Sequence, residues 1–136
     1  MNKSIEEKFV NTFIVKDKRE RILFELNSAK KRVFALRRLF QLLDKRFTVL
    51  EKRNIEGSEL IAEIKKYAVM DNNCYIISDS VDDGKMLPLE VAIKNMLEYE
   101  MTYVIICDEN TVVASEEYEI CGTPTKMILN KNNIQR

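Results

Sequence analysis

The sequence predicts a single α+β domain in which N-terminal helices pack on a small mixed sheet of three to four strands. Three observations lead to this prediction. Apolar residues recur with helical spacing through residues 1–70, and short apolar runs alternate with turn residues through 71–130. No linker rich in Pro, Gly or Ser separates the two regions. We therefore expect one domain of 136 residues, with a frayed tail at 131–136.

Two short helices are expected at the start of the chain. A Ser-Ile-Glu-Glu capping box at Ser4 precedes apolar residues spaced by four, which predicts a helix over 5–14. A second polar cap at 17–20 precedes another apolar group that ends at Leu26. This pattern predicts a second short helix.

The most regular segment predicts one long amphipathic helix over 29–53. Its apolar residues recur at alternating spacings of three and four: Val33, Leu36, Phe40, Leu43, Phe47 and Leu50. Cations repeat every seven residues on the opposite side: Lys31, Arg38, Lys45 and Lys52. We interpret the segment as a core helix with one basic face. A homodimer that forms through the apolar face is the alternative that the pattern leaves open.

The remaining elements alternate between helix and strand. Helices are expected to begin at Gly57 and near Pro88. Four apolar runs predict strands, at residues 74–77, 102–107, 111–114 and 125–129. A strand, helix and strand in succession favour a parallel crossover, and the hairpin at 108–110 adds an antiparallel neighbour. The sheet is therefore expected to be mixed.

Composition excludes several classes of function. Histidine is absent, which removes imidazole-based acid–base catalysis, Ser/His and Cys/His nucleophiles and most zinc sites. The three glycines are too scattered for a phosphate-binding loop. Three cysteines without CxxC spacing (Cys74, Cys107 and Cys121) favour reduced thiols in the cytoplasm. No signal peptide and no apolar run of membrane-spanning length is visible, so we expect a cytoplasmic protein without a membrane partner.

The charges cancel in total but not along the chain. Residues 16–53 carry thirteen Lys or Arg against five Asp or Glu, whereas residues 54–136 carry seven against fifteen. Such a separation indicates either that the two regions face each other or that one of them faces a charged partner.

An acidic loop has the strongest resemblance to a ligand site. Asp79, Asp83, Gly84 and Glu90 fall at positions 1, 5, 6 and 12 of a calcium-binding loop. Position 3 is Val81, which offers no oxygen ligand, and a proline lies inside the loop. We therefore predict that the protein holds no metal and no cofactor, and that these residues form a turn and a helix start.

The function predicted from these observations is that of a small non-enzymatic protein that binds a basic partner protein through an acidic surface. An immunity-type or antitoxin-type inhibitor of a basic enzyme is one form of this hypothesis. The candidate surface comprises eight carboxylates: Asp79, Asp82, Asp83, Asp108, Glu109, Glu116, Glu117 and Glu119.

The alternative is an accessory protein that binds nucleic acid through the basic helix over 29–53. Its contact residues are the four spaced cations, Lys31, Arg38, Lys45 and Lys52. The acidic region would repel a polyanion, and Phe34, Phe40 and Phe47 are expected in the core rather than between the cations. A carboxylate-dependent enzyme that uses a divalent metal is the least favoured class.

Overall fold

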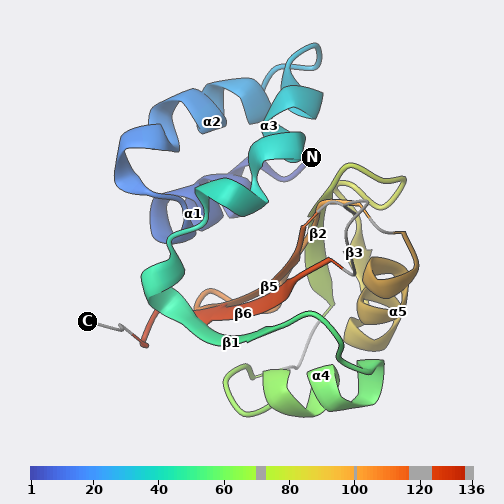
Figure 1. Cartoon of the computed structure of the whole chain (residues 1–136). Helices are drawn as coiled ribbons and strands as arrows, with labels where there is room; N and C mark the ends of the chain where they lie inside the picture. The colour runs from blue at the N-terminus through green and yellow to red at the C-terminus, as the bar shows by residue number, and fades with distance from the viewer. Residues whose placement is uncertain (70–72, 100, 117–123, 134–136) are drawn as a thin grey trace.

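The computed structural model describes residues 1–69, 73–99, 101–116 and 124–133. These residues form three layers, in which one antiparallel sheet lies between two groups of helices (Figure 1). The predicted α+β class is confirmed. Of the predicted frayed tail, residues 134–136 lie outside the described residues.

The elements follow one another along the chain as helices first and strands later. The helices are α1 (Lys3–Phe13), α2 (Arg19–Leu26), α3 (Arg32–Arg38), α4 (Gly57–Ile64) and α5 (Leu89–Tyr99). Three short 3₁₀ turns are η1 (Lys16–Lys18), η2 (Phe40–Leu42) and η3 (Lys45–Phe47). The strands are β1 (Thr48–Lys52), β2 (Cys74–Ser78), β3 (Met86–Leu87), β4 (Tyr103–Ile106), β5 (Thr111–Ser115) and β6 (Lys126–Asn130).

Within the described residues the sheet has six strands in the order β1-β6-β5-β4-β2-β3, and every neighbouring pair is antiparallel. The prediction of three to four strands in a mixed sheet was therefore an undercount and wrong in strand direction. The short strand β3 explains the difference. Because β3 runs antiparallel to β2, the chain is level with the start of β2 when α5 begins. Helix α5 then leads to the end of the sheet where β2 ended. Strand β4 starts there and therefore runs antiparallel to β2.

The prediction of one helix over 29–53 is wrong. The α-helix ends at Arg38, and Leu43 is extended and forms a β-bridge with Ile14. The N–H of Asp44 donates to the carbonyl of Phe13 at 2.6 Å, which ties this segment to the end of α1. The chain then enters β1, which pairs with β6. Hydrogen bonding to two distant segments outweighs the helical spacing of the apolar residues.

Two apolar cores lie on opposite faces of the sheet. Helices α1, α2 and α3 cover the first core, whose large buried side chains include Phe9, Phe13, Ile22, Leu39 and Phe40. Helices α4 and α5 cover the second core, whose large buried side chains include Leu60, Ile64, Ile76, Ile93 and Tyr103. Helices therefore cover both faces of the sheet (Figure 1).

Candidate binding groove and charged surfaces

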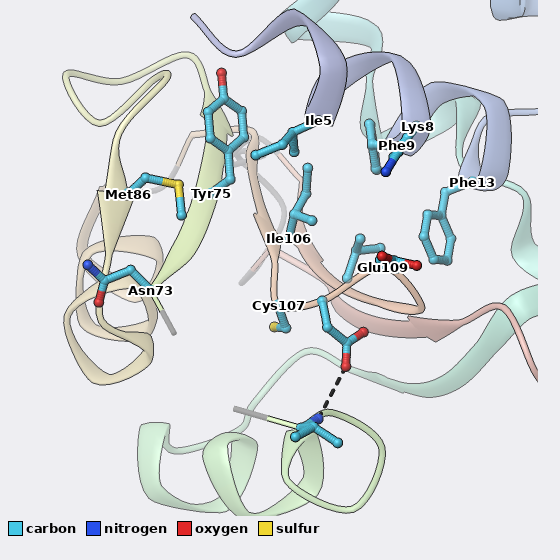
Figure 2. A pocket seen from close by; sticks show the side chains of 13 residues that line it. Ile5, Lys8, Phe9, Phe13, Asn73, Tyr75, Met86, Ile106, Cys107 and Glu109 are labelled. Atoms are coloured by element: carbon cyan, nitrogen blue, oxygen red, sulfur yellow. Dashed lines mark hydrogen bonds between the residues drawn. The ribbon is translucent and has the colours of Figure 1, made fainter. Parts of the chain in front are cut away.

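A groove of about 420 Å³ opens between α1 and one end of the sheet. Figure 2 shows side chains from α1, β2, β3 and the β4–β5 turn converging on it. Its apolar lining comprises Ile5, Phe9, Phe13, Tyr75, Met86, Ile106 and Val112. Met86 is 48% exposed, because it lies on the short edge strand β3. The groove therefore offers an apolar surface that solvent reaches.

Charged groups lie at the rim of this groove. Asp108 and Glu109 come from the β4–β5 turn, and Lys8 comes from α1. The Asp108 carboxylate accepts hydrogen bonds from the N–H of Asn110 at 2.8 Å and of Val69 at 3.2 Å (Figure 2). Asp108 is thus held in place by backbone, whereas Glu109 is exposed. The rim carries an excess of one negative charge.

Asp82, one of the eight carboxylates of the predicted acidic surface, is buried. Its side chain accepts hydrogen bonds from the hydroxyl of Tyr103 at 2.7 Å and from the amide of Asn95 at 2.8 Å. Burial, together with the hydrogen bond to Asp82, raises the pKa of Tyr103 well above its ordinary value. Asp82 therefore joins the β2–β3 turn to α5 and β4 and does not face a partner.

Asp83 belongs to a buried ionic cluster with Arg32 and Glu6. The Arg32 guanidinium makes five hydrogen bonds: two to Glu6, two to Asp83 and one to the Leu26 carbonyl, at 2.7–3.0 Å. Burial opposes the charge of Arg32, but the hydrogen bonds that Arg32 donates to both carboxylates outweigh this effect and raise the pKa of Arg32. The cluster joins α1, α3 and the β2–β3 turn.

Tyr75 connects this cluster to the sheet. Its hydroxyl donates to Glu6 at 2.6 Å and accepts from the N–H of Asn2 at 2.9 Å. Burial and the hydrogen bond to Glu6 raise the pKa of Tyr75 to about 12. Among the described residues no buried side-chain oxygen or nitrogen lacks a hydrogen-bond partner.

The other candidate carboxylates lie at opposite ends of the sheet. Asp79 follows β2 and Glu116 follows β5, at the end where β4 begins. Asp108 and Glu109 lie at the other end, beside the groove. Glu117 and Glu119 lie outside the described residues. The described carboxylates therefore do not form one continuous acidic patch.

The four spaced cations do not share a face. Lys31 precedes α3 and Arg38 is its last residue, whereas Lys45 lies in η3 and Lys52 ends β1. We call residues 16–53 the basic region and residues 54–136 the acidic region. The cations of the basic region instead make ion pairs within the chain: Arg32–Asp83, Arg37–Asp79, Arg38–Glu25, Arg46–Asp44 and Lys52–Glu59. Three of these pairs join the basic region to the acidic region. Part of the charge separation along the chain is thus cancelled by pairing in the fold.

A second surface feature lies across α2 and α3. Phe24 and Phe34 are 62% and 54% exposed, contrary to the expectation that Phe34 is in the core. They line a hollow of about 490 Å³ with Arg21, Glu25, Lys31 and Arg38. The Lys31 ammonium lies 5.1 Å from the centre of the Phe24 ring, a cation–π distance. We call these six residues the aromatic–basic patch.

In the part of the chain that the structure describes, no group of three or more His, Cys, Asp or Glu side chains could hold a metal ion. None of its helices is long and apolar enough to cross a bilayer. Comparison with known proteins finds no matching family, curated protein or solved structure.

Proposed function

We propose that this chain is a non-enzymatic protein that binds a partner protein, and that the partner inserts an apolar side chain into the groove between α1 and the sheet. The observation that carries the proposal is an open, mainly apolar groove with Asp108 and Glu109 at its rim. Apolar concave sites with a few placed polar groups are the usual form of binding sites. An inhibitor of a basic enzyme is one form that such a protein takes.

The charges at the rim favour a basic segment over an acidic one. Asp108 is fixed by two backbone N–H groups, so its carboxylate is oriented before a partner arrives. Glu109 is exposed and adds a second negative charge next to it. Lys8 lies on the opposite side of the groove, on α1 (Figure 2). A segment with an apolar residue next to Arg or Lys matches this arrangement, because attraction at the rim speeds association.

Reversal of the rim charge is expected to weaken this binding. Peptides selected from a random twelve-residue display library against the whole protein should combine apolar and basic residues. We expect Glu109→Lys to lower their affinity about tenfold, or ~1.4 kcal/mol, mainly through slower association. Surface plasmon resonance of the selected peptides measures both the affinity and the association rate.

Glu98→Lys is the matched control, since Glu98 is exposed on α5, on the other side of the sheet. It makes the same change of net charge and should leave the affinity unchanged. Equal losses in the two variants would show that only net charge matters. That result, or selection of acidic peptides, would contradict the groove as the binding site.

The aromatic–basic patch favours a second candidate function, the binding of single-stranded nucleic acid. Proteins of this kind stack bases on exposed aromatic rings and hold phosphates with nearby Lys or Arg. Phe24 and Phe34 supply two exposed rings, and Arg21, Lys31 and Arg38 supply the cations. Glu25 lies in the same hollow but pairs with Arg21 and Arg38. The proposed nucleic-acid surface is therefore the aromatic–basic patch and not a long basic helix over 29–53.

Removal of the two rings tests this candidate. If the patch binds a labelled single-stranded oligonucleotide, Phe24→Ala and Phe34→Ala should each cost about 1–3 kcal/mol of binding free energy. Binding should also fall steeply between about 50 and 200 mM salt. Tyr67→Ala, which removes an exposed aromatic ring elsewhere, is the control and should have no effect. Fluorescence anisotropy is the measurement, and absence of binding at low salt removes this candidate.

A further inference from the structure

Cys74 and Cys107 face each other across two neighbouring strands. Cys74 begins β2, and Cys107 directly follows β4. Because Tyr75 is paired with Ile106, one further step in the same antiparallel register places Cys74 opposite Cys107. Both cysteines belong to the core on the α4–α5 side of the sheet. Their side chains therefore leave the same face of the sheet at adjacent positions.

The backbone hydrogen bonds show which kind of pair they form. The N–H of Asp79 donates to the carbonyl of its opposite residue Thr102 at 3.1 Å, and bonded and non-bonded pairs alternate from there. Cys74 lies five residues before Asp79, and Cys107 lies five residues after Thr102. The pair Cys74–Cys107 is therefore a non-hydrogen-bonded pair. Consistently, the Cys107 N–H donates to Thr111 on the other neighbouring strand at 3.0 Å.

Non-hydrogen-bonded positions bring Cα atoms to roughly 4.5 Å, the closest approach in an antiparallel sheet. A disulfide bond requires Cα atoms about 4.4 to 6.8 Å apart, so this position accepts one without movement of the strands.

The two thiols contact each other, and Cys107 lines the groove. A hydrogen bond between the side chains lowers the pKa of Cys74, and the same hydrogen bond, together with burial, raises the pKa of Cys107. Cys74 is fully buried, whereas Cys107 is 8% exposed. Cys107 lines the groove (Figure 2). A small oxidant that enters the groove therefore reaches Cys107 first.

We propose that Cys74 and Cys107 form a modification site, at which a hydroperoxide that enters the groove converts the two thiols to an intramolecular disulfide. The Cys107 sulfur attacks hydrogen peroxide, the O–O bond breaks, and the thiol becomes a sulfenic acid with release of one water. The Cys74 sulfur then attacks the Cys107 sulfur, the S–O bond breaks, and a second water leaves with the Cys74 proton. Two thiols are oxidised and one peroxide is reduced to two waters.

The order of the two steps follows from access rather than from acidity, because Cys74 has the lower pKa but is fully buried. Cys107 is the accessible thiol, and Cys74 is the neighbouring resolving thiol within hydrogen-bonding reach. A sulfenic acid beside a resolving thiol condenses to a disulfide, which a dithiol reductant reverses. This inference does not depend on the proposed partner, because it rests on the cysteine pair alone.

Mass spectrometry of the whole protein tests the proposal. Every protein used in this experiment carries Cys121→Ser, so that only Cys74 and Cys107 can react. The reduced protein is treated with hydrogen peroxide, unfolded, alkylated and weighed. We expect loss of two hydrogens, no alkylation at Cys74 or Cys107, a proteolytic fragment that links the two residues, and full reversal by dithiothreitol.

The Cys74→Ser variant separates the two steps. Without the resolving thiol, Cys107 should accumulate as sulfenic acid and be labelled by dimedone, while its circular dichroism spectrum matches that of the parent. The parent measurement alone decides the proposal if this variant does not fold. Full alkylation of both cysteines after an excess of peroxide would overturn the proposal, as would disulfides only between molecules.

Discussion

Arg32→Met is expected to lower the free energy of unfolding by about 3–5 kcal/mol, because it leaves the buried carboxylate of Glu6 and the partly buried carboxylate of Asp83 without their cation. Glu6 and Asp83 each receive two hydrogen bonds from this guanidinium. Methionine fills a similar volume, so the loss reports on charge rather than on a cavity. Urea unfolding followed by circular dichroism gives the free energy from the midpoint and slope.

Two further variants identify the cause of that loss. Glu6→Gln and Asp83→Asn, added together to Arg32→Met, remove the uncompensated charges and should restore most of the stability. Arg37→Met breaks the exposed ion pair with Asp79, in which the side chain of Arg37 is 60% exposed. This variant should change the free energy of unfolding little. A loss in Arg32→Met no larger than that in Arg37→Met would show that the buried cluster contributes nothing to stability.

Phe40→Ala is the second change with a large expected effect, about 3–5 kcal/mol of unfolding free energy. Phe40 is only 4% exposed and lies in the core beneath α1, α2 and α3. Removal of its ring leaves a cavity that the surrounding side chains fill only in part. Thermal and urea unfolding both measure the loss.

The control for Phe40→Ala is Phe24→Ala, the same substitution at an exposed position, which should change stability by less than about 0.5 kcal/mol. Sedimentation of Phe40→Ala also tests the dimer alternative raised by the apolar spacing of residues 29–53. If Phe40 lies in an interface between two copies, the variant dissociates into a folded monomer without loss of monomer stability. Such an outcome would contradict the burial of Phe40 within one chain.

Much of the fold could be predicted from local patterns. The predicted strands at 74–77, 102–107, 111–114 and 125–129 correspond to β2, β4, β5 and β6. These runs are apolar and β-branched, and their strands are buried on both faces, so the local signal and the environment agree. The turn at Asp82–Gly84 is also confirmed, and Gly84 adopts the positive φ of 80° that favours glycine.

Residues 29–53 show where local patterns fail. Leu36, Phe40 and Leu43 are all buried in the core, as their spacing indicates, but they do not lie on one helix. The bridge between Leu43 and Ile14 and the pairing of β1 with β6 depend on partners far away in sequence. Apolar spacing identifies residues that need burial, and long-range hydrogen bonds decide the conformation in which they are buried.

The charged residues could not be assigned from sequence for a similar reason. Arg32 binds Glu6, 26 residues before it, and Asp83, 51 residues after it. No local spacing connects these positions, so the sequence predicts Asp83 on an exposed surface, whereas it lies partly buried against Arg32. Asp108 and Glu109 retain a place in the proposed site, because the β4–β5 turn puts them beside the groove.

Site-specific photo-crosslinking in the native host tests whether a partner protein binds in the groove. A photoreactive benzoylphenylalanine at Met86, in the groove, is compared with the same residue at Glu98 on α5 and at Phe34 in the aromatic–basic patch. The proposal predicts that Met86 captures one protein through a segment rich in Lys or Arg, and that Glu98 captures nothing. Absence of a crosslink from Met86, with capture of nucleic acid or protein from Phe34, would contradict the groove as the functional site.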